Sequence, residues 1–322
     1  MTQVLLVRMS SLGDVLHTFP AVTDLRRERP QAVLHWAVEE AYVPLVRLHP
    51  GVARVVPVAL RRWRHRLFAR ASWQELKALR AALAEPPFDA ILDTQGLLKS
   101  AFVAKMAHGP VHGFGARTAR EPLASRFYDF RYDFAPAEHK VERYREVAAR
   151  ALGYARRGEP DYGIAAPARP GFAPSGDYCV LLHATARDAK LWREDAWREI
   201  ARALGARGLA CVLPWGNDVE RARSERIAAG FAHAIVPPRM SIPEAAGLIG
   251  NARAALGVDT GLMHLAAALR VPVVGIFCDS EPLDARPVGQ GRTAFRGGIG
   301  KPPSVREVLE ALAGLVPELG AG

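Results

Sequence analysis

The sequence has no apolar run long enough for a membrane-spanning helix, and it has few cysteines. Such a helix needs ~18 or more consecutive apolar residues, and no stretch of the chain reaches that length. The N-terminus opens directly on an apolar run, Val4–Val7, without the pattern of a signal peptide. The cysteines, Cys179, Cys211 and Cys278, each lie in or beside an apolar run, with neither metal-ligand spacing nor a disulfide pattern. We therefore expect a cytoplasmic protein with buried, reduced thiols.

Familiar nucleotide- and nucleic-acid-binding motifs are also absent. The chain has neither a Walker loop nor a Gly-x-Gly-x-x-Gly motif, which argues against a generic dinucleotide site. It has no signature of a helix-turn-helix, zinc finger, RRM or KH domain. The basic stretch Arg61–Arg66 contains a tryptophan, and such residues can hold phosphates and stack on bases. A basic loop that meets the phosphates or carboxylates of an anionic lipid explains the same residues.

The positive charge lies mostly in the first half of the chain. The 322 residues suggest about two domains, and the net charge is +10. Residues 1–150 contain 23 Lys and Arg against 15 Asp and Glu, whereas residues 151–322 contain 20 against 18. We therefore expect the first half to attract an anionic partner, which could be nucleic acid, a membrane surface or a phosphorylated substrate.

Apolar runs alternate with helical patterns through the first half, which favours a parallel sheet covered on both faces. The predicted strands are Val4–Val7, Val33–Val38, Val55–Val58 and Ala90–Leu92, and the predicted helices are Val15–Arg27, Trp73–Leu83 and Leu97–Ala107. The pattern weakens between Thr118 and Ala137, and a helix is predicted over Val141–Leu152.

The segment Gly158–Gly176, rich in Pro, Gly and Ala, is typical of an inter-domain linker, and the alternation restarts after it. The later strands are predicted over Tyr178–Leu182, Ala210–Leu213, Ala254–Gly257 and Val273–Phe277, and the helices over Ala196–Arg207, Val219–Ala229, Ile242–Asn251, Leu262–Leu269 and Val305–Leu315. We therefore predict an α/β protein with two Rossmann-like, doubly wound domains that face a central cleft, where ligands bind at the carboxyl ends of strands. Residues 1–165 would form the first domain, 166–303 the second, and 304–322 a C-terminal helix that packs back on the first.

The first candidate motif is a strand-to-helix turn at Arg8–His17. Its glycine permits close backbone approach, and the free amides at the helix start favour an anionic or polar ligand. Asp14 stands where such a turn would aim a carboxylate into the cleft. The alternative is that Asp14 or Ser11 only caps the helix, which is a common role.

Two further motifs follow strands in the second half. In Val258–His264 a strand leads into a helix that Thr260 could cap, and the amides of that helix start could cradle a diphosphate. A capped helix with a histidine on one face is the simpler interpretation. In His183–Trp192, Lys190 could neutralise a phosphate, or it could be an ordinary solvated lysine.

Together these motifs resemble those of one family. Seven segments follow the family order: Arg8–His17, Arg61–Arg66, Asp93–Ser100, Thr118–Ser125, His183–Trp192, Leu213–Gly216 and Asp259–His264. The sequence is similar, from Met1 to about Val274, to the lipopolysaccharide heptosyltransferase I family of glycosyltransferase family 9. Those enzymes are inverting transferases of GT-B architecture, which move a heptose from ADP-heptose to a Kdo sugar of lipid A on the cytoplasmic face of the inner membrane.

The resemblance also implies roles for individual residues. Asp14 would be the general base that deprotonates the Kdo hydroxyl. The implied donor-binding residues are Thr185, Lys190, Glu220, Asp259, Thr260, Gly261, Leu262 and His264, with Glu220 on the adenosine ribose and Asp259 on a heptose hydroxyl. The implied acceptor-binding residues are Ser10, Gly13, Arg61, Arg62, Arg64 and Arg120.

Some residues depart from the family pattern. Ala186 stands where a second threonine is frequent, His65 where a lysine is frequent, and Met263 where a serine is frequent. No Asp-x-Asp motif occurs in the chain, which fits a transferase that uses no metal or other cofactor and in which protein dipoles stabilise the departing ADP. The alternatives are another GT-B transferase, such as a heptosyltransferase II, and a basic protein without activity that binds membranes or nucleic acid.

Overall fold

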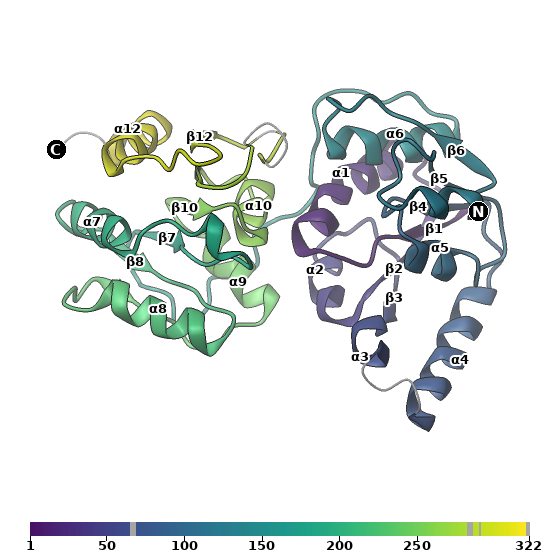
Figure 1. Ribbon diagram of the computed structural model, residues 1–322, viewed down its shortest axis with the longest axis horizontal. Coiled ribbons are helices and arrows are strands. Elements are labelled where there is room, and N and C mark those ends of the chain that lie inside the picture. Colours follow the sequence, from purple (N-terminus) through teal and green to yellow (C-terminus); the bar gives the residue numbers. More distant parts are fainter. Residues whose placement is uncertain (65–68, 282–285, 290, 320–322) are drawn as a thin grey trace. The chain divides into compact units, whose positions relative to one another are not determined.

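The computed structural model describes residues 1–64, 69–281, 286–289 and 291–319, and it divides into two compact units (Figure 1). The first unit is Met1–Gly163 and the second is Ile164–Gly322. The boundary lies within the stretch Gly158–Gly176 that has the composition of a linker. Among the described residues, no helix combines the length and apolar character needed to cross a bilayer.

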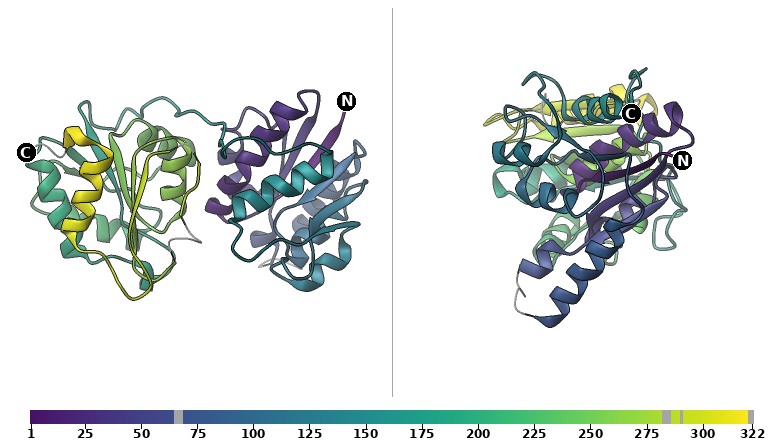
Figure 2. Two further views of the ribbon diagram at one scale, coloured as in Figure 1. Left: turned by 90° about the horizontal axis from the view of Figure 1, so that it is seen from above. Right: turned by 90° about the vertical axis from the view of Figure 1, so that its right-hand side faces the viewer.

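The first unit is a six-stranded, fully parallel sheet with the order β3-β2-β1-β4-β5-β6. Its strands are β1 (Gln3–Val7), β2 (Val33–Glu39), β3 (Arg54–Val58), β4 (Ala90–Asp93), β5 (Val111–Phe114) and β6 (Phe130–Tyr132). Its helices are α1 (Leu12–Glu28), α2 (Val43–Val46), α3 (Leu60–Arg64), α4 (Arg70–Ala84), α5 (Leu98–Ala104) and α6 (Lys140–Leu152), with 3-10 turns at Glu40–Tyr42 and Pro122–Phe127. Helices lie on both faces of the sheet (Figure 2), which explains why its central strands β1 and β4 are almost entirely buried and mostly apolar.

The second unit repeats this architecture, with the strand order β12-β11-β10-β7-β8-β9. Its strands are β7 (Tyr178–Leu182), β8 (Ala210–Val212), β9 (Ala234–Ile235), β10 (Ala254–Val258), β11 (Val273–Phe277) and β12 (Thr293–Gly297). Its helices are α7 (Glu194–Gly205), α8 (Asp218–Ala228), α9 (Ile242–Gly250), α10 (Gly261–Ala268) and α12 (Val305–Leu315), with 3-10 turns at Asp188–Lys190 and Pro317–Leu319. All pairs are parallel.

In each unit the first three strands run outward from the centre of the sheet in one direction, and the next three run outward in the other. The first strand of the unit lies beside its fourth, so β1 pairs with β4 and β7 pairs with β10. Loops that leave the carboxyl ends of such neighbouring strands diverge to opposite faces, and ligands bind in the crevice between them. The turns after β1 and β4, and those after β7 and β10, are therefore the places to look for functional groups.

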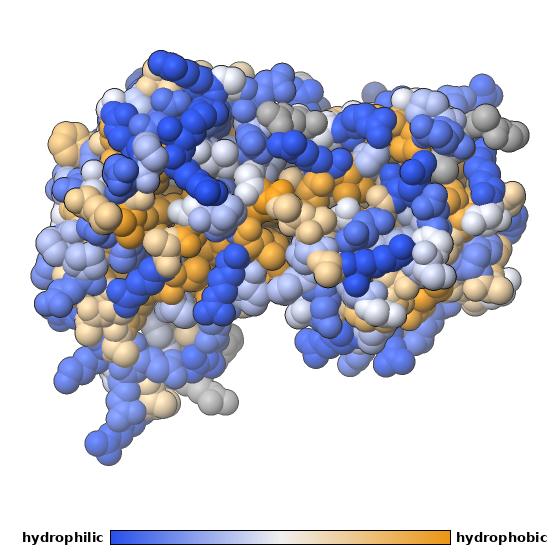
Figure 3. All heavy atoms as spheres, turned by 180° about the vertical axis from the view of Figure 1, so that it is seen from behind, coloured by the Kyte–Doolittle hydropathy of each residue, from blue (hydrophilic) through white to orange (hydrophobic). Residues whose placement is uncertain are grey.

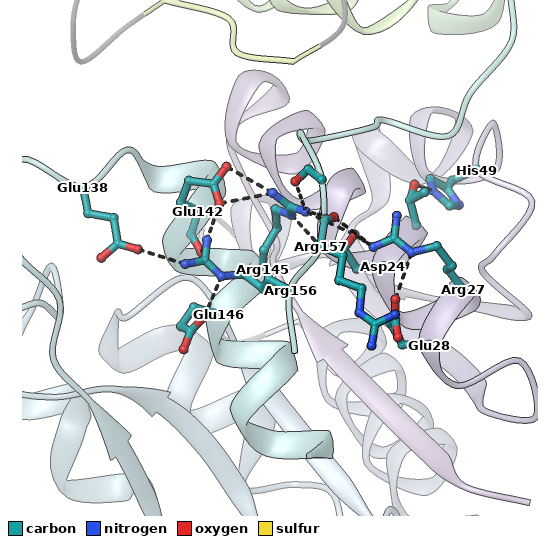
Figure 4. A network of polar contacts seen from close by, with 12 residues as sticks. Asp24, Arg27, Glu28, His49, Glu138, Glu142, Arg145, Glu146, Arg156 and Arg157 are labelled. Atoms are coloured by element: carbon teal, nitrogen blue, oxygen red, sulfur yellow. Dashed lines mark hydrogen bonds and ion pairs between the residues drawn. The ribbon is translucent and has the colours of Figure 1, made fainter. Parts of the chain in front are cut away.

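A buried ion pair holds the start of the linker on the first unit (Figure 4). Arg145 of α6 is buried, and its Nε lies 2.6 Å from Asp24 Oδ2 on α1. The same guanidinium donates hydrogen bonds to the backbone carbonyls of Arg157 and Gly158, both at 3.1 Å. Arg156 pairs with Glu142, also on α6. Because a buried charge needs partners, this network fixes the chain as far as Gly158.

The structure confirms the predicted doubly wound fold and every predicted central strand, but it corrects two details. The strands β5, β6, β9 and β12 were not predicted. β6 and β9 carry few buried side chains, which leaves little apolar pattern to detect. The expectation that residues 304–322 pack back on the first domain is wrong for α12. Its buried residues Val308, Ala311 and Leu312 join the core of the second unit, with β11, β12 and α7.

The cysteines are free and buried, as predicted. Burial raises the pKa of Cys179 and that of Cys211 to about 12, so both thiols stay protonated and unreactive near neutral pH.

Candidate active site

The turns after β1 and β4 are joined by direct hydrogen bonds. The backbone N–H of Met9 donates to Gln95 Oε1 at 2.8 Å. Gln95 lies in a turn folded around the buried Asp93, whose Oδ1 accepts from the amides of Gln95 (2.8 Å) and Gly96 (3.2 Å). Tyr128 donates its hydroxyl proton to the other Asp93 oxygen at 2.8 Å. Asp93 therefore has a structural role, and it fixes the turn beside which α1 begins.

Asp14 lies in the first turn of α1, with Ser11 at the N-cap position. Its Oδ2 accepts hydrogen bonds from the backbone N–H and the hydroxyl of Ser11, at 3.4 and 3.3 Å. These bonds are long, so capping is a weak constraint on the carboxylate. The side chain is 20% exposed, and its Oδ1 lies 3.8 Å from Lys140 Nζ at the start of α6. Asp14 thus has a capping role and keeps one oxygen beside a cation.

Positive charge surrounds the Asp14 carboxylate. Burial alone would raise its pKa, but the charges of Arg8, Lys140 and Arg120 and the Ser11 amide together lower it below the ordinary value. Arg8 is buried at the end of β1, with its guanidinium carbon 4.3 Å from the centre of the Tyr144 ring. Asp14 is therefore ionised at neutral pH, in a setting that favours anions.

The predicted acceptor residues fall into two groups. Ser10 and Gly13 lie in the same turn as Asp14, and the charge of Arg120 lowers the pKa of Asp14. Ser10, Gly13 and Arg120 therefore form the group around Asp14. The arginines of α3 lie beyond β3, the edge strand of the sheet. His65 and Arg66 lie outside the described residues.

The α3 arginines differ in how they are held. Arg62 pairs with Glu40 at 3.0 Å and with Glu75 of α4 at 2.9 Å, so its charge is largely compensated. Arg61 lies against Tyr42, with its guanidinium carbon 5.5 Å from the ring centre. Arg64 is exposed. Arg61 and Arg64 are therefore better placed than Arg62 to bind an added anion.

In the second unit, the turns after β7 and β10 meet at Asp259. Lys190 Nζ pairs directly with Asp259 Oδ2, and His264 Nε2 lies 3.9 Å from Oδ1. Thr185 donates its hydroxyl proton to the backbone carbonyl of Asp259 at 3.0 Å. Burial raises the pKa of Asp259, but His264, Lys190 and Ser280 outweigh that effect and hold it well below its usual range. Four of the predicted donor residues thus form one cluster.

The start of α10 completes this cluster. Thr260 occupies its N-cap position, and Gly261 and Leu262 are its first residues. The Thr260 side chain makes no capping hydrogen bond, contrary to our expectation that it could cap the helix. The first amides of a helix have no acceptors within that helix and carry its positive partial charge, so they suit an anionic ligand.

Glu220 lies apart from that cluster, in the first turn of α8. Its Oε2 accepts from the Gly216 amide at 2.7 Å and its Oε1 from the Asn217 side chain at 3.0 Å. The carboxylate is therefore held against the loop between β8 and α8, which contains Trp215. Trp215 is itself fixed by a hydrogen bond to the Pro237 carbonyl at 2.8 Å.

Two neighbours of the Asp14 site were not predicted as site residues. Arg8 had a local signal, because it ends an apolar strand directly before the turn. Lys140 had none, because only the packing of α6 against α1 brings it near Asp14. In the parts of the chain that the structure describes, no three His, Cys, Asp or Glu side chains gather in a way that could hold a metal ion.

Comparisons with known proteins point to one family. Residues 76–311 match the model of glycosyltransferase family 9 (heptosyltransferase). Lipopolysaccharide heptosyltransferase 1 of Escherichia coli K12 is 44% identical over 283 residues, which are 87% of this chain and 89% of that protein. The protein of the same name from Pseudomonas aeruginosa is 44% identical over 282 residues, 87% of this chain and 79% of that protein.

Solved structures give the same result. The E. coli heptosyltransferase WaaC with ADP superimposes with a TM-score of 0.91 and 39% identity, over 98% of this chain and 100% of that one. WaaC with ADP-2-deoxy-2-fluoro heptose gives a TM-score of 0.86 and 40% identity, over 98% and 99%. The E. coli heptosyltransferase II, at 22% identity and a TM-score of 0.76 over 100% of both chains, shares the fold.

Proposed function

This chain belongs to glycosyltransferase family 9, the heptosyltransferases, and we propose that it moves L-glycero-D-manno-heptose from ADP-heptose to Kdo of Kdo-lipid A. The chain is a GT-B glycosyltransferase of lipopolysaccharide core synthesis, and its donor is a nucleotide-linked heptose. The observation that carries the proposal is 44% identity to lipopolysaccharide heptosyltransferase 1 over 87% of the chain.

Asp14 would act as the general base toward the acceptor. A sugar hydroxyl is a poor nucleophile near neutral pH, so a carboxylate within hydrogen-bond reach assists its attack. The positive surroundings keep Asp14 ionised but make it a weak base. We infer that it takes the proton late, when the bond from the Kdo oxygen to the heptose is already forming. The positive charges of Lys140, Arg8 and Arg120 would also attract the carboxylate of Kdo.

The cluster around Asp259 would hold the donor. ADP leaves as an anion, and the amides at the start of α10 together with Lys190 would stabilise the charge that develops on it. The present pair of Lys190 with Asp259 would open when the donor binds, so that Lys190 meets the diphosphate and Asp259 a heptose hydroxyl. Thr185 and His264 would position these two groups, and Glu220 would bind the adenosine ribose.

A base on one side of the anomeric carbon and a leaving group on the other predicts inversion of configuration. We further propose that the reaction needs no metal ion, because Lys190 and the start of α10 supply the positive charge and the sequence has no Asp-x-Asp motif. EDTA should leave the turnover rate nearly unchanged. A loss of ~10-fold or more that magnesium restores would contradict this proposal.

The acceptor is a lipid, so the enzyme would work at the cytoplasmic face of the inner membrane as a peripheral protein. Arg61 and Arg64, in the half of the chain that carries most of the excess positive charge, would meet the anionic acceptor and membrane surface.

The direct experiment is to mix the protein with ADP-heptose and Kdo-lipid A and to measure ADP release together with the mass of the lipid product. We expect both ADP and a lipid heavier by one heptose. Heptose transfer only to an acceptor that already carries a heptose would identify a heptosyltransferase II. Ligand binding without any turnover would contradict the assignment as an enzyme.

A further inference from the structure

An apolar pocket lies between α3, α4 and α5, and Arg61 and Arg64 of the proposed acceptor site contribute to its lining. Its volume is ≈ 350 Å³, at the lower end of the range of small-molecule sites. Its lining residues are Glu39, Leu60, Arg61, Trp63, Arg64, Ser72, Trp73, Leu76, Lys99 and Phe102. The interior is made mainly of the leucines and aromatic rings, so it suits a hydrocarbon better than a sugar.

Two large apolar side chains are unusually exposed beside this pocket. Trp73 of α4 is 63% exposed and Phe102 of α5 is 58% exposed. Apolar residues reach the surface elsewhere too, as Figure 3 shows, and a single exposed ring needs no explanation. Here, however, both rings line one cavity, so that an apolar ligand would cover surface that is otherwise in contact with water.

The wall of the pocket is held in place by Glu75. Its Oε2 accepts a hydrogen bond from the indole nitrogen of Trp63 at 2.6 Å, and its Oε1 pairs with Arg62 at 2.9 Å. These bonds tie α3 to α4 and keep Trp63, which is 7% exposed, facing the cavity. The site is therefore already formed without a ligand, which lowers the cost of binding.

The charged groups of the pocket are mostly cationic. Arg61, Arg64 and Lys99 contribute to its lining. Glu39 is the one carboxylate among the lining residues. Its Oε1 accepts a hydrogen bond from the Arg61 amide at 3.1 Å, and burial raises its pKa. An apolar interior with a cationic rim is complementary to one acyl chain of a lipid that also carries anionic groups.

We propose that this pocket receives one acyl chain of the lipid acceptor, while Arg61, Arg64 and Lys99 meet anionic groups of the same molecule. The proposal rests on the proposed function, since it takes the acceptor to be a lipid-linked sugar. The pocket would place the lipid so that its sugar extends toward the carboxyl edge of the sheet, and it would make the enzyme prefer acylated over deacylated acceptors.

The test compares two acceptors, Kdo-lipid A with its acyl chains and the same Kdo-saccharide stripped of all of them. Replacing Phe102 by Gln removes the apolar wall without changing charge. We expect this variant to raise the KM for the acylated acceptor about tenfold and to leave kcat/KM for the deacylated one unchanged. Phe102→Leu should behave like the unchanged protein. Ile299→Gln, at an equally exposed apolar residue of the second unit, is the matched control and should change neither constant.

A binding measurement separates the pocket from the transfer reaction. An ω-bromo-undecanoate, kept below its micelle concentration, should quench the fluorescence of Trp63 and Trp73 in a saturable way, because bromine quenches on contact. Phe102→Gln should weaken this binding about tenfold, and Ile299→Gln should not.

Three results would overturn the proposal: equal effects of Phe102→Gln on both acceptors, quenching that Phe102→Gln leaves unchanged, or a Phe102→Gln variant that only turns a dimer into a monomer. The last would make the patch a contact between two copies of the chain. If the unchanged protein transfers heptose to neither acceptor, the proposed function fails, and the quenching experiment still decides whether the pocket binds an acyl chain.

Discussion

The two units share one strand order, yet they hold their central carboxylates in different ways. In the first unit, Asp14 Oδ1 lies 3.8 Å from its nearest cation, Lys140, and Oδ2 accepts only long hydrogen bonds from Ser11. In the second unit, Asp259 is paired directly with Lys190 and has His264 at 3.9 Å. Both carboxylates are ionised, but Asp14 is loosely held, whereas Asp259 is bound to its partners.

This difference matches the two tasks that a sugar transfer requires. A base must have an oxygen that can accept a proton, and the surrounding cations, of which Lys140 lies 3.8 Å away, keep Asp14 charged without a short hydrogen bond to it. A donor site needs a cation for the diphosphate and an acceptor for a sugar hydroxyl, and the pair of Lys190 with Asp259 keeps both groups side by side until the donor would separate them. We therefore propose that the first unit activates the acceptor and the second binds the donor.

The largest effect should come from Asp14→Asn. Asparagine preserves the shape of the side chain and much of its capping capacity, but it cannot take the proton. General-base catalysis typically contributes about 10²–10⁴-fold, so we expect a loss of kcat of that order, measured by ADP release.

The Asp14→Asn variant must remain folded for this result to be informative. Circular dichroism and the thermal midpoint should change little, because the hydrogen bonds of Asp14 to Ser11 are long. A variant that unfolds but keeps its activity per folded molecule would make Asp14 a structural cap. Full activity in a folded variant would place the base elsewhere.

The second largest effect should come from Lys190→Ala. A hydrogen bond to a charged group contributes about 1.5–3 kcal/mol, so the KM for ADP-heptose should rise or kcat should fall by roughly 10- to 100-fold. Acceptor dependence should stay normal. Arg187→Ala is the matched control, since Arg187 lies in the same loop but pairs with Asp279 at 3.1 Å. An unchanged donor dependence in Lys190→Ala would mean that Lys190 is an ordinary loop lysine.

A smaller effect is expected when Arg61 and Arg64 are both replaced by Ala. The KM for the lipid acceptor should rise several-fold, and binding to vesicles rich in phosphatidylglycerol should weaken. Added salt should weaken binding by the unchanged protein more than by the variant, because exposed charges are screened over about 10 Å at ~0.1 M.

Arg62→Ala is the control for that double variant. Its charge is already compensated by Glu40 and Glu75, so its effect on the salt dependence should be smaller. If the double variant kept normal acceptor kinetics, the acceptor would have to bind at a different surface.

The smallest effect should be a shift in pH dependence in Lys140→Gln. Because the pKa of Asp14 is lowered, its ionised form persists as pH falls until that pKa is reached, and activity is lost below it. Removing Lys140 removes one lowering charge, so the pKa rises and the acid limb of the kcat profile moves to higher pH. Two charges about 4 Å apart in water interact by about 1 kcal/mol, so the shift should be roughly 0.7 pH units or less.

Lys140→Arg should retain the original profile, because it keeps the charge. Since Lys140 is 41% exposed, solvent screens the pair and the effect stays small. An acid limb that moves to lower pH in Lys140→Gln would show that Lys140 does not lower the pKa of the catalytic group.

The sequence was sufficient for most of the interior strands, because buried parallel strands are often continuous apolar runs. It missed the interior strand β5, in which His112 and Gly113 interrupt the apolar run. The edge strands β6 and β9 have no fully buried side chains, so their sequences lack the apolar pattern that predicts a strand. Asp14 was found from a local strand–turn–helix signal, whereas Lys140 lies near it only through the packing of α1 and α6. The ion pairs of Arg62 could not be predicted from the sequence either, because Glu40 and Glu75 lie in other elements that only the fold brings close to it.

The proposal that the second unit binds the donor and the first activates the acceptor can be tested by measuring donor affinity. ADP-heptose is titrated into the protein without acceptor in a calorimeter. We expect Asp14→Asn to bind the donor with the affinity of the unchanged protein, to within about twofold, while its turnover with acceptor falls by about 10² or more. Lys190→Ala should bind the donor at least about tenfold more weakly. Donor affinity that falls in Asp14→Asn and stays normal in Lys190→Ala would contradict it.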